Sequence, residues 1–168
     1  MAHTKRIAAD SILAAMALLL FMVEAQIPAV IPIPGIKPGL ANIMTLVALR
    51  LFGKRDAAAV LFVRVVLGAV LAGNASTFCF SACGALFCFL LLCILQRIDR
   101  MPLWVRSIFG AMAHNAGQLL VACIWMHTPS VFWYAPYLLL SSIVSGSFTG
   151  LCAQFSLHHL SRKEDTRL

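Results

Sequence analysis

The chain has 168 residues, of which 61% are hydrophobic and only 11% are charged, and its mean hydropathy is +0.92. A soluble domain is typically about half apolar and a quarter charged, so this chain has too few polar residues to cover a water-soluble fold. The net charge of +7 does not indicate nucleic-acid binding, because the basic residues form no stripe with interleaved aromatics. The composition predicts an integral membrane protein with a single domain over residues 1–168.

Six apolar runs follow one another along the chain, each of a length that suits a membrane helix. They predict an all-α bundle of six transmembrane helices, at about residues 7–26, 37–52, 57–73, 78–95, 105–126 and 135–157. The second and third runs are short, so we expect these helices to tilt or to lie where neighbouring helices thin the bilayer.

Basic residues cluster in alternate connections between these runs. The connections at Asn74–Thr77 and His127–Tyr134 contain no Lys or Arg, whereas both chain ends, the connection between the second and third runs and the connection between the fourth and fifth runs are basic. The positive-inside rule therefore predicts that the N- and C-termini lie in the cytoplasm. Glu24, Lys37 and Arg64 are the charged residues that fall outside the clusters, and charge in such places is costly and usually functional.

A stiff, apolar, proline-rich loop over residues 27–35 follows Glu24 at the end of the first run. It is either a lid or wall of an outward-facing pocket, or a loop that rests at the lipid interface. Lys37 and Pro38 come next, and Pro38 suits the first position of the second helix. A helix N-terminus beside a lysine favours anion binding, although Lys37 alone is also explained by contact with lipid headgroups.

Polar side chains inside three of the runs indicate a pocket. Asn42 lies one helical turn before Thr45 on the second helix, and Arg64 lies near the middle of the third. The fifth run contains the group His114, Asn115 and Gln118, which helical spacing brings close together. Two interpretations are open: these residues bind a ligand, with Arg64 holding an anionic group, or they join helices through polar contacts.

Small residues form stripes on two of the predicted helices. In the last run they recur every four positions, at Ser142, Gly146 and Gly150, which favours close helix packing over a subunit interface. A shorter stripe in the first run, which we interpret as a docking face for a partner membrane protein, consists of Ala8, Ser11 and Ala15.

Catalytic and metal-binding motifs are absent from the sequence. It has no Asp-rich diphosphate–magnesium motif, no glycine-rich phosphate loop and no nucleophile elbow. The six cysteines lie inside apolar runs without Cys-x-x-Cys spacing, so neither a metal site nor a disulfide framework is expected. We expect no enzyme activity, no metal and no cofactor.

Several segments together resemble a known family. Glu24 with its proline-rich loop is followed in order by residues 34–42, Arg64, residues 81–84 and residues 110–118. This order resembles the bacterial membrane family catalogued as Gx transporter, or heptaprenyl diphosphate synthase component I, over about residues 10–155. Pro38 departs from the pattern, in which Leu is more usual. The family is similar to the substrate-binding S components of energy-coupling-factor (ECF) importers.

The resemblance implies a six-helix binding protein of the bacterial cytoplasmic membrane, with its pocket near the outer face and a membrane coupling subunit with ATPases as partner. We therefore expect uptake of a small molecule that has an anionic or hydrogen-bonding group. The alternative, suggested by the family name, is a membrane component of isoprenoid metabolism that binds a lipid-like prenyl diphosphate. The residues expected to line the pocket are Glu24, Lys37, Asn42, Arg64, His114, Asn115 and Gln118.

Overall fold

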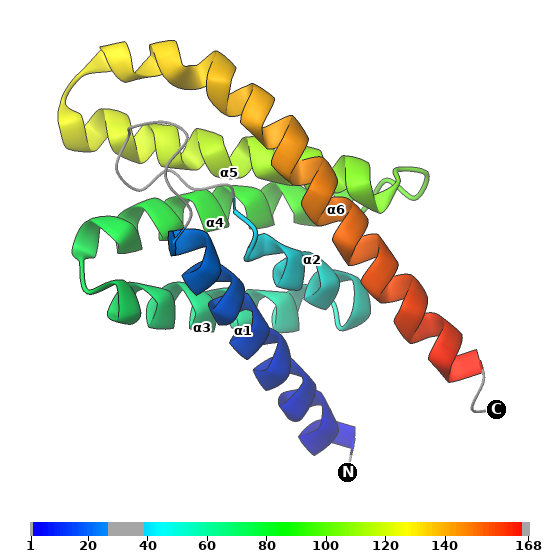
Figure 1. Cartoon of the computed structure of the whole chain (residues 1–168). Helices are drawn as coiled ribbons and strands as arrows, with labels where there is room; N and C mark the ends of the chain where they lie inside the picture. Colours follow the sequence, from blue (N-terminus) through cyan, green and yellow to red (C-terminus); the bar gives the residue numbers. More distant parts are fainter. Residues whose placement is uncertain (1, 27–38, 166–168) are drawn as a thin grey trace.

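The computed structural model describes residues 2–26 and 39–165, which form a bundle of helices (Figure 1). The elements in chain order are α1 (Ala2–Gln26), α2 (Asn42–Leu51), α3 (Lys54–Ala72), α4 (Ala75–Leu95), α5 (Leu103–Met126), the 3-10 helix η1 (Pro129–Tyr134) and α6 (Ala135–Asp165). The described residues contain no β-strand, so the all-α prediction is confirmed. The six α-helices correspond in order to the six predicted runs.

The start of α2 differs from its prediction. The sequence predicts a start at Pro38, but the helix begins at Asn42 because Gly39 has a left-handed backbone with φ +80°. The amide of Asn42 instead closes a turn by donating to the Gly39 carbonyl at 3.0 Å. A helix of ten residues rises about 15 Å, whereas the hydrocarbon core of a bilayer is roughly 30 Å thick. By itself α2 is therefore too short to cross a membrane.

Four helical segments are long and apolar enough to cross a membrane, namely Thr4–Gln26, Ala75–Leu95, Leu103–Met126 and Ser130–His159. Helix α3 has sufficient length but contains Arg55, Asp56 and Arg64. Large apolar side chains remain exposed around the bundle, for example Phe155 at 73% and Val70 at 71%. A surface of this kind suits contact with lipid, which fits a multi-pass membrane protein. The six-span count and the cytoplasmic location of the termini stay predictions.

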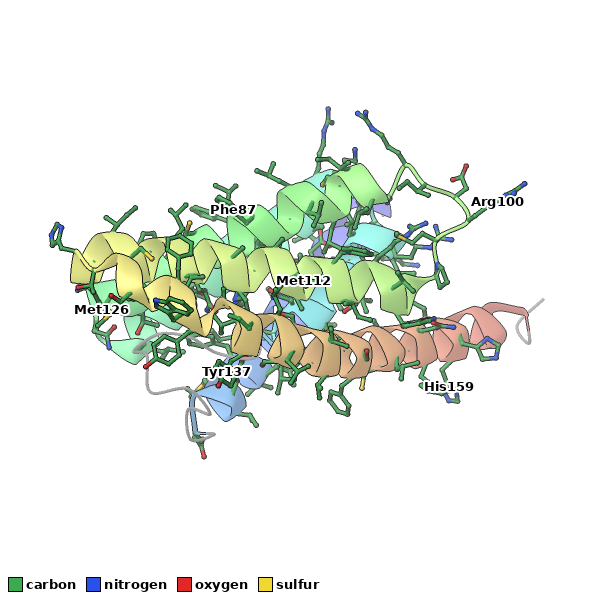
Figure 2. All side chains as sticks on the ribbon, turned by 90° about the horizontal axis from the view of Figure 1, so that it is seen from above. Phe87, Arg100, Met112, Met126, Tyr137 and His159 are labelled. Atoms are coloured by element: carbon green, nitrogen blue, oxygen red, sulfur yellow. The ribbon has the colours of Figure 1, made fainter. Side chains whose placement is uncertain are left out.

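The two ends of the bundle differ in chemistry. Helix α1 begins and α6 ends at the same end as the α2–α3 and α4–α5 connections (Figure 1). We call this the basic end, because its side chains include Arg6, Arg50, Lys54, Arg97 and Arg106. Figure 2 shows Arg100 and His159 at this end and Met126 at the opposite one. We call the opposite end the aromatic end, because it has Trp125, Trp133, Tyr134 and Tyr137, with Trp133 82% exposed.

Glycines allow α5 to pack closely against both of its main neighbours, α4 and α6. A Cβ added at Gly117 would lie 2.8 Å from the Cys83 carbonyl oxygen of α4. On α6, a Cβ added at Gly146 would lie 2.6 Å from the Cα of Ile108, and Gly150 is equally close to Trp104. The small-residue stripe of α6 therefore lies against α5 within the chain. Helix α2 contacts α1, α3, α4 and α6 and lies at the centre of the bundle.

Candidate functional site

Arg64 lies in the middle of α3, and its side chain is only 3% exposed. Its Nη2 donates a hydrogen bond to Oδ1 of Asn42 at 3.0 Å, and its Nη1 lies 3.5 Å from Oγ of Ser81. Its Nε has no hydrogen-bond partner among the described residues. Leaving a donor of a buried charged group unsatisfied is costly, so Arg64 keeps hydrogen-bonding capacity that the described residues do not use.

Glu24 brings a carboxylate to the same region from the end of α1. The buried positions of α1 include Ala17, Phe21 and Glu24, so helical spacing places the carboxylate on the inner face. The amide of Gly39 donates a hydrogen bond to Oε1 of Glu24. The carboxylate is also close enough to act electrostatically on Arg64. Its negative charge offsets part of the cost of burying the guanidinium.

His114 and Gln118 form the opposite wall from α5, where both are almost fully buried. Their place depends on Gly84 of α4. A Cβ added there would lie 2.9 Å from Cε1 of His114 and 3.0 Å from Cγ of Gln118. The missing side chain of Gly84 thus provides the space that the imidazole and the amide occupy.

These groups surround one small cavity toward the aromatic end of the bundle. Its lining residues are Phe21, Glu24, Gly39, Arg64, Thr77, Ser81, His114 and Gln118. The cavity measures about 10 Å³, which is room for about one water molecule. Cationic, anionic, imidazole, amide and hydroxyl groups therefore face a single space. A larger ligand requires the surrounding elements to move apart.

A second cavity of about 10 Å³ adjoins the first at Gly39 and continues toward the centre of the bundle. Its lining is more apolar and includes Leu46, Cys88 and Leu92. Asn42 lines this second cavity and connects the two through its hydrogen bond to Arg64.

A family comparison places these residues in a wider group. The family model described as heptaprenyl diphosphate synthase component I matches residues 13–156. The chain belongs to this family. The matched range contains all the residues that line the two cavities, and it confirms the family resemblance that the sequence suggested. The similarity to ECF S components stays a prediction, and comparisons with curated proteins and with solved structures gave no match.

Asn115, the third polar residue predicted on α5, is not among the lining residues of these cavities. Its Nδ2 donates to the Leu138 carbonyl at 3.1 Å and to Oγ of Ser142 at 2.8 Å, both on α6. Consecutive side chains on a helix do not face each other, and here Asn115 is directed to α6 whereas His114 lines the cavity. In this family member Asn115 joins α5 to α6.

Two further predictions concern the surroundings of the cavity. Lys37 lies outside the described residues, so its contact with a ligand stays a prediction. Ala8, Ser11 and Ala15 are all exposed on the outer face of α1, which leaves them accessible to lipid or to a partner.

The sequence-based reasoning missed several lining residues of the first cavity. Thr77 and Ser81 lie one helical turn apart on α4, and hydroxyls at that spacing in an apolar run are a signal that could have found them. Phe21 is one apolar residue among many in α1, and no sequence pattern distinguishes it from the apolar residues that do not line the cavity.

Proposed function

We propose that this protein binds a small molecule between its helices near the aromatic end and contributes to its uptake across the membrane. The ligand would present an anionic or hydrogen-bonding group to Arg64. The observation that carries this proposal is the buried guanidinium of Arg64, whose Nε has no hydrogen-bond partner among the described residues, in a side chain that lines a cavity together with other polar groups.

The main rival is a purely structural role for Arg64. An arginine that served only to join helices would be expected to have all its donors satisfied, because each unsatisfied buried donor lowers stability. The described part of the chain instead leaves Nε of Arg64 and Oγ1 of Thr45 without hydrogen bonds, although both residues are buried. Of these two residues, Arg64 lines the cavity, and its unused hydrogen-bonding capacity there supports recognition of a ligand.

An uptake role would need energy from a partner, because the sequence has no nucleotide-binding loop. The outer face of α1 supports such an association, since Ala8, Ser11 and Ala15 leave a shallow surface on which another membrane helix can pack closely. The proposed partner is a membrane coupling subunit that works with ATPases.

The family description favours a second candidate function, binding of a prenyl diphosphate in isoprenoid metabolism. The diphosphate would contact Arg64, and the more apolar second cavity beside Asn42 would receive the first carbons of the tail. The sequence lacks the Asp-rich motif that prenyl transfer needs, so this candidate is a binding role and not catalysis.

A thermal-stability screen of the purified protein against water-soluble vitamins, flavins and prenyl diphosphates would test both candidates. A ligand that binds the native state raises the melting temperature in proportion to its affinity and concentration. Stabilisation by a water-soluble compound supports uptake, whereas stabilisation only by prenyl diphosphates supports the second candidate.

Two arginine variants on α3 provide the control. Arg64→Gln should abolish the ligand-induced shift, whereas Arg55→Gln should leave it unchanged, because Arg55 is exposed at the basic end. If no compound binds and Arg64→Gln only lowers the melting temperature of the free protein, the structural role of Arg64 is correct instead.

A further inference from the structure

The basic end of the bundle contains a third cavity, which is far larger than those beside Arg64. Its volume is about 350 Å³, within the range of roughly 300–1,000 Å³ that is usual for small-molecule sites. It lies where α2 and α4 end and α5 begins, and its lining consists of Arg50, Gln96, Asp99, Met101, Pro102, Leu103, Arg106, Gln154 and Leu157. The cavity beside Arg64 shares none of these residues.

Two of the lining side chains are held in place by backbone carbonyls. Nη2 of Arg106 donates to the Ile98 carbonyl at 2.7 Å, and Nε2 of Gln96 donates to the Leu49 carbonyl at 3.1 Å. Each side chain keeps another buried polar atom, Nε of Arg106 and Oε1 of Gln96, without a partner among the described residues. Two side chains that line the cavity thus keep one donor and one acceptor whose hydrogen-bonding capacity the described residues do not use.

The charges in this cavity favour an anion. Two lining arginines, Arg50 and Arg106, stand against one carboxylate, Asp99, which leaves an excess of one positive charge. Within the described residues neither arginine forms an ion pair; the pair found there joins Arg6 to Asp56 instead. The first turn of α5 begins at Leu103, after Pro102, and has no side-chain cap, so the backbone N–H groups of this turn add positive potential.

We propose that this cavity binds a phosphate group, carried by a soluble phosphate ester or by the headgroup of a membrane lipid. One guanidinium group can bind two phosphate oxygens at once, so Arg50 and Arg106 suit a phosphate ligand. Oε1 of Gln96 can accept a hydrogen bond from a hydroxyl group of the ligand. Met101, Leu103 and Leu157 provide apolar surface for its carbon atoms. A glycerol phosphate unit has all three features, and the proposal does not depend on the function assigned to Arg64.

The test measures the melting temperature of the full chain, purified in neutral detergent, with increasing glycerol 3-phosphate and, separately, with phosphatidylglycerol or phosphatidylcholine in mixed micelles. The melting temperature should rise with glycerol 3-phosphate or with phosphatidylglycerol. It should not rise with phosphatidylcholine, because the quaternary ammonium of that headgroup cancels the phosphate charge and the headgroup has no hydroxyl group for Gln96. A rise with glycerol 3-phosphate alone identifies a soluble ester as the source of the phosphate. A rise with phosphatidylglycerol alone identifies a lipid headgroup.

Substitutions separate a specific site from general attraction of anions. Arg106→Gln and Arg50→Gln should each raise the ligand concentration for half-maximal stabilisation about tenfold or more, because each removes a charge-assisted hydrogen bond. Arg100→Gln is the matched control, since Arg100 is exposed in the α4–α5 connection at the same end of the bundle and does not line the cavity.

Two results would overturn the proposal: neither phosphate compound stabilises the wild-type chain, or Arg100→Gln weakens the effect as much as Arg106→Gln does. Arg106→Gln removes the hydrogen bond to Ile98 and could impair folding. Arg50→Gln removes no hydrogen bond of the described structure, so it decides the question if Arg106→Gln does not fold.

Discussion

Arg64 and Asn42 are joined by a hydrogen bond of 3.0 Å between Nη2 and Oδ1, which connects the middle of α3 to the first residue of α2. Asn42 in turn follows the turn at Gly39, whose amide is bound by Glu24 at the end of α1. The guanidinium, the start of α2 and the end of α1 thus form one connected unit. A ligand that engages Arg64 would therefore also affect the turn that precedes α2.

Asn42→Ala should test this connection. Loss of the hydrogen bond to Arg64 should lower the free energy of unfolding by about 1 kcal/mol, since hydrogen bonds between membrane helices contribute about that much or less. The ligand found in the screen should also bind more weakly, because the guanidinium is no longer held in place.

Asn74→Ala is the matched control for this substitution. Asn74 caps α4 by accepting a hydrogen bond from the Thr77 amide at 2.8 Å, so its loss should lower stability by a similar amount, about 1 kcal/mol. Denaturant unfolding and ligand titration of both variants would separate the effects. Equal ligand affinity in the two variants would contradict a role for Asn42 in the site.

Gly84→Ala should change the shape of the cavity beside Arg64 without removing any of its polar groups. The new Cβ would lie 2.9 Å from Cε1 of His114, so the imidazole must move. We expect ligand affinity to fall at least tenfold, with a loss of about 1–3 kcal/mol in the free energy of unfolding, as is typical of overpacking.

Gly110→Ala is the comparison, because the atoms nearest to its Cβ would belong to the side chains of Leu92 and Cys88, at 3.2–3.3 Å. Those side chains line the second cavity and can adjust, so the affinity for a ligand that is held only in the cavity beside Arg64 should be largely retained. Isothermal titration of both variants measures the difference, and similar affinities would show that the His114 wall does not contact the ligand.

The neighbours His114 and Asn115 should respond in opposite ways to truncation. His114→Ala removes a lining group of the cavity and should weaken ligand binding about tenfold or more, the usual result of losing a buried hydrogen-bonding partner. Asn115→Ala removes two hydrogen bonds to α6 and should lower the free energy of unfolding by about 1 kcal/mol with ligand affinity unchanged. If Asn115→Ala abolishes binding of a folded protein, the site extends to α6.

The sequence predicted the helices well because apolar runs bounded by charge or glycine leave few alternatives. The Gly73–Asn74 connection is an example: Gly73 ends α3 with a left-handed backbone, and Asn74 caps α4. The predicted start of α2 was wrong because it relied on Pro38, which is a good first residue of a helix. The amide of Gly39 donates a hydrogen bond to Glu24, fifteen residues earlier in the chain. This tertiary contact outweighs the local preference of Pro38 for a helix start.

Polar residues in apolar runs were a good guide to burial but a weaker guide to which partners they contact. Arg64, His114, Asn115 and Gln118 are all buried. Burial follows from the high cost of polar groups in lipid, whereas the choice between the cavity and α6 depends on helix rotation and on close approach at Gly84 and Gly117. Tertiary packing determines the rotation of each helix and the close approach at these glycines, and neither can be read from the spacing of polar residues.

Gly146→Ala should lower stability without touching the cavity beside Arg64. The added Cβ would lie 2.6 Å from the backbone Cα of Ile108, so α5 and α6 must separate. A loss of about 1–3 kcal/mol or more in the free energy of unfolding is expected. Val144→Leu adds one carbon on the exposed face of the same helix and should change stability by less than about 0.5 kcal/mol. Equal stability of the two variants would indicate that α6 can shift on α5.

The orientation of the bundle can be tested with reporters at its two ends. A fluorescent protein that folds only in the cytoplasm should be bright when inserted at Arg100, in the α4–α5 connection at the basic end. The same insertion at Thr128, between α5 and η1 at the aromatic end, should be dark, and alkaline phosphatase should give the reverse pattern. The expected result rests on the basic residues near Arg100, which the positive-inside rule places in the cytoplasm. Bright fluorescence at Thr128 and not at Arg100 would show that the bundle has the opposite orientation. The cavity beside Arg64 would then lie toward the cytoplasm, and this position would exclude it as a capture site for uptake.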